Sequence, residues 1–134
     1  MKFQHFKFVF TLFLSIFLLA ACSSNKEETV VKDFYSALSA GDTSKAVSMI
    51  DFSSVPEKDR ALASNKFMAL LGEMKIRDFD PHNGIKSVDI TNKQPSSDGN
   101  SVSMTVTLTY GDGTTKTTNM TVVKVNNEWK ISMQ

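Results

Sequence analysis

The sequence predicts an α+β domain: three N-terminal helices packed on a curved, four-stranded antiparallel sheet. Apolar residues recur at helical spacing up to about residue 74, and after Gly84 the apolar period changes to two. Short turn-forming segments separate the expected strands, which favours antiparallel neighbours. The 134 residues, 41% of them hydrophobic, are enough for one core of ordinary size.

The first helix is expected over about residues 26–40. Ser24-Asn25-Lys26-Glu27 has the Ser-x-x-Glu form of a capping box, and Gly41 suits the left-handed residue that ends a helix. Asp42 then caps a second helix over about residues 43–50.

The third helix is expected over about residues 56–74, because Pro56 suits a first turn. Its expected inward stripe is Ala63, Phe67, Leu70, Leu71 and Met74. The turn-forming residues at 77–84 predict a loop.

Four strands are expected, over about residues 85–93, 102–110, 115–125 and 128–133. The second is the clearest, because Val102 to Tyr110 alternates strictly between apolar and polar residues. The third loses this alternation near its end, which predicts either a bulge or burial of both faces. Serine and threonine fill the other face of the second and third strands, which is a candidate surface for a partner.

The N-terminus has the three parts of a secretory signal. Residues 1–7 are basic, residues 8–19 are apolar but too short to span a bilayer, and small residues follow. We expect a signal peptide at 1–21, a tether at 22–26 and a single domain at 27–134.

The string Leu19-Ala20-Ala21-Cys22 resembles the lipobox of bacterial lipoproteins. The resemblance implies cleavage between Ala21 and Cys22 and diacylglycerol on the Cys22 sulfur. Two or three acyl chains hold a protein durably at a membrane. The alternative is an ordinary free cysteine after a cleaved signal. With Ser23 next, the resemblance implies the outer membrane, facing the periplasm, in a two-membrane cell, and otherwise the outer face of the cell membrane.

The run Phe34-Tyr35-x-Ala-Leu-x-x-Gly-Asp and the closing Asn-Glu-Trp-Lys-Ile at 127–131 resemble the nuclear-transport-factor-2-like (NTF2-like) superfamily. In particular, the chain is similar to small bacterial lipoproteins of unknown function with that fold. The resemblance implies a cone in which helices and a curved sheet enclose a cavity. Its members include enzymes, dimerising scaffolds and non-catalytic domains, so the fold does not select a function.

No catalytic set, metal site or cofactor motif is expected. His82 is the only histidine after the signal segment, and Asp78-x-Asp80 lacks the rest of a calcium loop, so a solvated loop is favoured there. Formal net charge is +1 overall, and removing Lys2 and Lys7 with the signal leaves 13 basic and 14 acidic residues. This balance gives no indication of nucleic-acid binding.

If the cone is hollow, a ligand pocket would be lined from its helices and its last strand. The candidate residues are Phe34, Tyr35, Leu38, Phe67, Leu71 and Trp129. The alternative, which we favour, is that these side chains simply fill the core.

Together these features predict a membrane-anchored envelope lipoprotein with a non-catalytic binding or scaffold domain. A homodimer through the sheet, an unknown protein and a small apolar ligand are the expected partners, besides the membrane reached through the lipid on Cys22. The alternatives are a small-molecule carrier or enzyme using the cone cavity, and a peptide-binding module that acts by strand addition.

Overall fold

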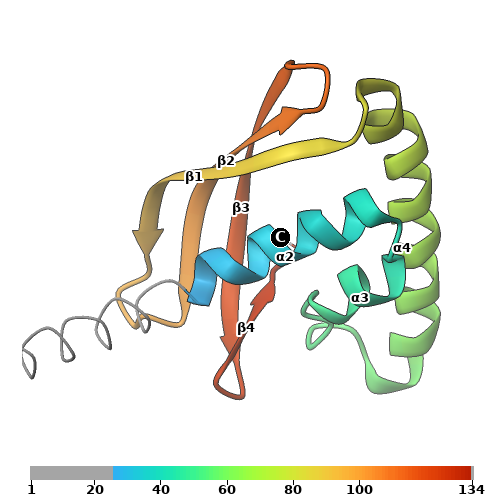
Figure 1. Ribbon diagram of the computed structural model, residues 1–134. Helices are drawn as coiled ribbons and strands as arrows, with labels where there is room; N and C mark the ends of the chain where they lie inside the picture. Colours follow the sequence, from blue (N-terminus) through green and yellow to red (C-terminus); the bar gives the residue numbers. More distant parts are fainter. Residues whose placement is uncertain (1–25, 134) are drawn as a thin grey trace, which may run out of the picture.

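A computed structural model describes residues 26–133 of the protein (Figure 1). Three helices precede a four-stranded antiparallel sheet, so the α+β class is confirmed. The expected signal segment, the cleavage site at Ala21 and the lipid attachment at Cys22 lie outside the described residues, and they stay predictions. Within residues 26–133, no helix is both long and apolar enough to cross a bilayer.

The first two helices follow the sequence closely. Helix α2 spans Lys26–Ala40, as expected, and α3 spans Thr43–Ser48. The Asp42 carboxylate caps α3 by accepting from the backbone N–H of Lys45 at 3.1 Å. Helix α3 ends two residues early because the next backbone groups bind strand β4: the N–H of Ile131 donates to Met49 O at 2.7 Å.

The third helical region is longer than expected. A 3₁₀ turn, η1 (Glu57–Asp59), leads into α4 (Arg60–Met74). A π-helical turn, η2 (Lys75–Phe79), and a 3₁₀ turn, η3 (Asp80–His82), then continue it. The expected loop at 77–84 is therefore wrong over most of its length, because Phe79 is buried and holds the turn against the core.

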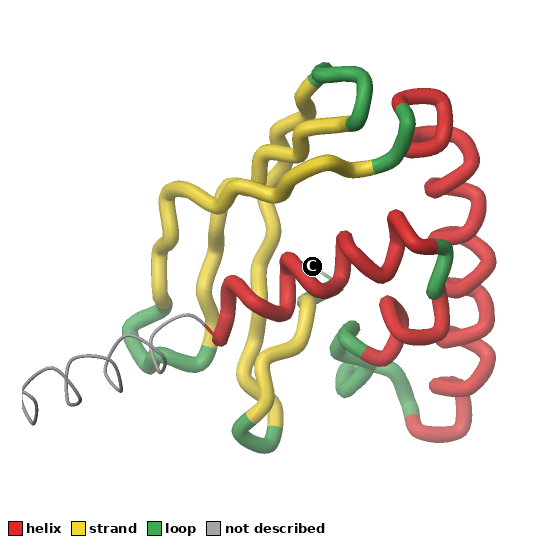
Figure 2. Tube along the Cα trace, in the orientation of Figure 1, coloured by secondary structure: helices red, strands yellow, loops and turns green. Residues whose placement is uncertain are grey.

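The strands are β1 (Ile85–Pro95), β2 (Ser101–Tyr110), β3 (Thr115–Val125) and β4 (Glu128–Ile131). They lie in the order β1-β2-β3-β4, joined by short turns (Figure 2). The bulge expected in β3 is absent, since its pairing with β2 and β4 is regular; its end is instead partly buried on both faces. Two register shifts lie in β1, between Ile85 and Ser87 and between Thr91 and Gln94.

The core lies between α2 and the sheet and extends under α3. Its fully buried side chains include Val31 and Leu38 of α2, Val106 of β2 and Val122 of β3. No polar or charged residue among the described ones is buried. Burial of these apolar side chains supplies the main stabilisation of the fold.

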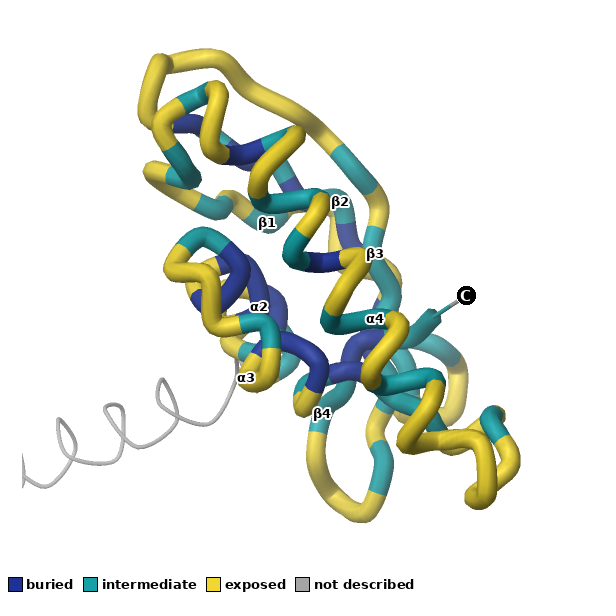
Figure 3. The backbone as a smooth tube through the Cα atoms, turned by 90° about the vertical axis from the view of Figure 1, so that its right-hand side faces the viewer, coloured by how far each residue is buried: buried dark blue, intermediate teal, exposed yellow. Residues whose placement is uncertain are grey.

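Helix α4 departs from the expectation that all three helices pack on the sheet. It lies beyond the end of the sheet and packs mainly against α3 (Figure 1). Leu71 is buried, but Leu70, expected on the inward stripe, is 57% exposed. Figure 3 shows α4 from its outer side, where most residues are exposed.

Candidate functional site

A groove lies between α2 and the edge strand β1. The helix is fastened to the strand at both ends. At one end the Ile85 N–H donates to the Ser39 hydroxyl at 3.1 Å, and at the other Lys93 Nζ lies 3.1 Å from Glu27 Oε1. The hydrogen bond with Glu27 raises the pKa of Lys93. The two ties hold the helix beside the strand and leave a gap between them.

This groove has a volume of about 470 Å³. Its lining combines two lysines and three serines with apolar side chains: Lys32, Ser36, Ser39, Ala40, Ile85, Lys86, Ser87 and Val88. None of these side chains is acidic. We refer to this site as the α2–β1 groove.

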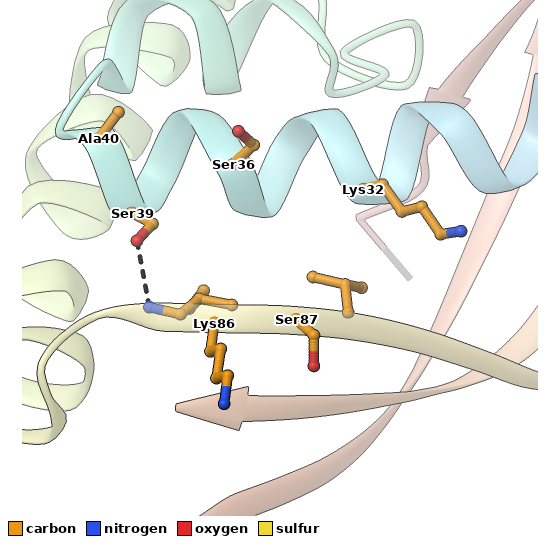
Figure 4. A pocket seen from close by; sticks show the side chains of 8 residues that line it. Lys32, Ser36, Ser39, Ala40, Lys86 and Ser87 are labelled. Atoms are coloured by element: carbon orange, nitrogen blue, oxygen red, sulfur yellow. Dashed lines mark hydrogen bonds between the residues drawn. The ribbon is translucent and has the colours of Figure 1, made fainter. Parts of the chain in front are cut away.

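The cations of the α2–β1 groove come from both of its walls. Lys32 extends from α2 along the opening, whereas the side chains of Lys86 and Ser87 point away from α2, on the far side of β1 (Figure 4). The shift in register between Ile85 and Ser87 puts Lys86 at an irregular point of the strand. At its opening the groove therefore offers the Lys32 ammonium of α2 beside the apolar Ile85 and Val88 of β1.

Most of the residues expected to line a cone pocket lie in the core. Phe34, Tyr35, Leu38 and Leu71 are each at most 7% exposed. Phe67 is partly buried and meets Phe52 edge-on, with ring centroids 5.5 Å apart. Their role as a ligand pocket stays a prediction.

Trp129 is the remaining member of that expected set, and it is only partly buried. It lines a separate hollow of about 370 Å³ with Val30, Asp33 and Met49. Lys124 Nζ lies 5.9 Å from the centroid of its ring, within the range of a cation–π contact. Trp129 is thus placed at the margin of the core.

Tyr35 keeps its hydroxyl in the apolar interior. Burial raises the pKa of Tyr35 to about 12, and charge on Tyr110 adds to the effect. The phenol therefore stays neutral at any physiological pH. A buried neutral phenol is a poor general base.

The structure brings together a second polar cluster that the sequence did not reveal. His82 Nδ1 lies 2.6 Å from Asp112 Oδ2, although the two residues are 30 positions apart. The His82 ring stacks on Tyr110 with centroids 5.0 Å apart. Asp112 also accepts from the hydroxyl and backbone N–H of Thr114, at 2.6 and 3.0 Å. His82 therefore has side-chain partners that the sequence did not indicate, although 43% of its side chain stays exposed, as expected of a solvated segment.

This cluster joins two turns. The N–H of Asp112 donates to His82 O, and that of Gly111 donates to Gly84 O, both at 3.0 Å. The hydrogen bonds from Thr114, followed by that from His82, lower the pKa of Asp112 to about 2. The arrangement fastens the β2–β3 turn to the segment before β1, and it explains the cluster without catalysis.

The polar face of the sheet is paired internally. Ser103 with Thr121, Thr105 with Asn119, and Thr107 with Thr117 each form a cross-strand side-chain hydrogen bond of 3.2 Å. Such pairs stabilise a sheet modestly. Over the part of the chain that the structure describes, no group of three or more His, Cys, Asp or Glu side chains could hold a metal ion.

Sequence reasoning missed the α2–β1 groove. Lys32, Ser36 and Ser39 occupy polar positions of α2, which is also where ordinary solvated residues stand. The spacing of Lys32 and Ser36 places them on one helix face, but the strand opposite could not be identified without the packing. The His82–Asp112 pair forms because two turns meet in the fold. No pattern of neighbouring residues in the sequence indicates it.

The family model for a domain of unknown function, DUF4878, matches residues 20–132. The chain belongs to the DUF4878 family. That match covers the whole described sheet and all three helices, so the fold described above is that of a DUF4878 member. No curated protein matches the sequence.

Two solved structures are similar to this DUF4878 domain. One is a Campylobacter jejuni protein named as an NTF2-like transpeptidase, with a TM-score of 0.70 and 22% identity, covering 83% of this chain and all of that one. The other is RPA3114 of Rhodopseudomonas palustris, a protein containing a SEC-C motif, with a TM-score of 0.51 and 13% identity, covering 85% of this chain and 82% of that one. The first similarity confirms the NTF2-like fold, and neither extends beyond fold.

Proposed function

We propose that this protein is a lipid-anchored, non-catalytic binding domain of the cell envelope, and that it binds a small anionic ligand in the α2–β1 groove. The observation that carries the proposal is the lining of that groove. Lys32 lies along the opening, Lys86 adds a second positive charge on the β1 side, and the lining includes three serines and no carboxylate. A concave site of one charge sign concentrates ligands of the opposite sign.

The chemistry of the lining favours a carboxylate, sulfonate or phosphate joined to an apolar group. A lysine ammonium acts as a compact point charge with three donors, and serine hydroxyls supply further donors. Ala40, Ile85 and Val88 give the same groove an apolar part. An amphiphilic anion satisfies both halves of this lining.

The anchor is part of the proposal. Cleavage before Cys22 would leave a tether of only four residues, 22–25, before α2 begins at Lys26. Four extended residues reach about 14 Å, so the groove would operate close to the membrane surface. The groove would therefore meet ligands that are released from the membrane surface or delivered to it.

Strand addition at β1 is the less favoured alternative. β1 is an edge strand and pairs only with β2 among the described strands. However, its two register shifts interrupt the regular ladder that an added strand would need. Lys86 and Lys93 also place charge on this edge, as proteins do to prevent pairing.

The proposal is tested by titrating the purified protein with 8-anilinonaphthalene-1-sulfonate, an anionic, apolar dye whose fluorescence rises on binding. Lys32→Glu reverses charge at the groove and should weaken dye binding about tenfold. Lys45→Glu makes the same change on exposed α3, outside the groove, and should leave binding unchanged. Equal affinity of the two variants would overturn the proposed site.

A further inference from the structure

Helix α4 and the π-helical turn η2 that continues it expose three large apolar side chains among polar ones. Leu62, Leu70 and Ile76 are 58%, 57% and 69% exposed, and they are the large hydrophobic side chains most exposed among the described residues. α4 packs on α3 along one side only, so Leu62 and Leu70 on its outer side remain exposed.

The exposed positions follow a regular pattern. Leu62, Lys66, Ala69, Glu73 and Ile76 succeed one another at steps of four, three, four and three residues. All five are exposed; this spacing places the first four on one face of α4, and Ile76 follows them in the π-helical turn η2. We call these five residues the outer seam of α4.

The outer seam is complementary to itself when reversed. A twofold axis through Ala69 places Leu62 opposite Ile76 of a second copy, since each lies seven residues from the axis. The same axis places Lys66 beside Glu73 of the second copy, within one residue of exact register, which is about 1.5 Å along a helix. Ala69 meets itself at the axis, where its small side chain permits close approach.

Other occupants fit the outer seam less well. A parallel pair of α4 helices would set Lys66 against Lys66 and Glu73 against Glu73, and like charges oppose association. A membrane would bury Lys66 and Glu73 in the middle of the apolar line, whereas membrane-surface helices keep charge on the opposite face. Only the antiparallel pair places Lys66 of one copy beside Glu73 of the other and packs Leu62 of one copy against Ile76 of the other.

We propose that two copies of this protein associate through the outer seams of their α4 helices, antiparallel about a twofold axis at Ala69. This interface is distinct from the sheet dimer expected from the sequence and from the α2–β1 groove. Both grooves stay open in the pair, because α2 and β1 lie on the inner side of α4 and the outer seam faces away from the sheet (Figure 1). The proposal does not depend on the proposed ligand.

Cysteine crosslinking of the full-length chain tests this interface. Cys22→Ser first removes the only native cysteine. Ala69→Cys in that background then places one thiol per copy at the proposed axis, where a disulfide requires Cα atoms within about 7 Å. Mild oxidation should give a disulfide-linked dimer. Thr107→Cys in the same background, on the polar sheet face, is the matched control and should stay monomeric.

The charges determine the orientation of the pair. Lys66→Glu should slow crosslinking through Ala69→Cys about fivefold, because two opposite-charge contacts become repulsive. Adding Glu73→Lys restores complementarity and should recover the rate. Crosslinking at Thr107→Cys without any at Ala69→Cys would overturn the proposal in favour of a sheet dimer. No crosslink at either position, or no recovery in the double charge variant, would also overturn it.

Discussion

Asp112 shows how one carboxylate can join segments that are distant in sequence. It accepts from Thr114 and meets His82, and these hydrogen bonds lower its pKa from the usual 3.8 to about 2. A carboxylate with a lowered pKa in the folded state stabilises the fold above its usual pKa, and this stabilisation is lost as pH falls towards the lowered value. The stabilising contribution of Asp112 is therefore lost as the pH falls from about 4 to about 2.

Asp112→Asn should make the fall in stability across that acid window shallower, because the titrating group is gone. Urea denaturation at half-unit steps between pH 2 and 5 measures this fall. Asp98, whose pKa is lowered by Ser96 and by the Asn100 N–H, keeps part of the fall in place. An unchanged pH profile in Asp112→Asn would show that the folded protein does not hold the carboxylate as described.

At the level of elements, the docking of the β2–β3 turn on the segment before β1 depends on Gly111. A Cβ at this position would lie 2.4 Å from Asn83 O, so the backbone would have to move. That movement breaks the bonds from Gly111 and Asp112 to the neighbouring turn. Glycine here is required by space and not by a left-handed φ.

Gly111→Ala should therefore lower the free energy of unfolding by about 1–3 kcal/mol. Gly72→Ala is the matched control: nothing lies within 4 Å of its Cβ position, and Gly72 stands inside α4. It should stabilise the protein by up to about 1 kcal/mol, since alanine favours a helix more than glycine does. Chemical denaturation gives both values, and the same sign for both would contradict the packing described here.

Prediction from sequence succeeded where local chemistry decides an element. The capping box and Gly41 located α2, and strict alternation located β2. It failed where distant packing decides. The burial of Phe79 made a helical turn from an expected loop, and contacts with β4 ended α3 early. The position of α4 beyond the sheet could not be predicted either. Leu70 and Leu71 both fit the expected inward stripe, but only Leu71 is buried.

The candidate site was harder to predict than the fold for the same reason. The α2–β1 groove depends on one helix meeting one edge strand 46 residues away, as the Ser39–Ile85 bond shows. Sequence analysis instead chose aromatic and aliphatic residues, most of which fill the core. Solvated lysines and serines carry no periodic signal of function, so only their juxtaposition reveals them.

At the level of the whole molecule, the proposed anchor connects the domain to a membrane. Cys22→Ser should abolish incorporation of radiolabelled fatty acid and leave the protein as an unprocessed precursor or a released form. Metabolic labelling in a bacterial host measures this directly. Continued labelling of the variant would contradict acylation at Cys22.

The central claim is that the α2–β1 groove is the ligand site of this DUF4878 domain. The most direct measurement is an NMR titration of the ¹⁵N-labelled protein with 8-anilinonaphthalene-1-sulfonate, which follows every backbone amide. The largest shifts should fall on Lys32, Ser36, Lys86 and Ser87, and Lys32→Glu should require about tenfold more dye to reach the same shifts. Largest shifts at the Trp129 hollow or along the outer seam of α4 would contradict the claim and relocate binding to those residues.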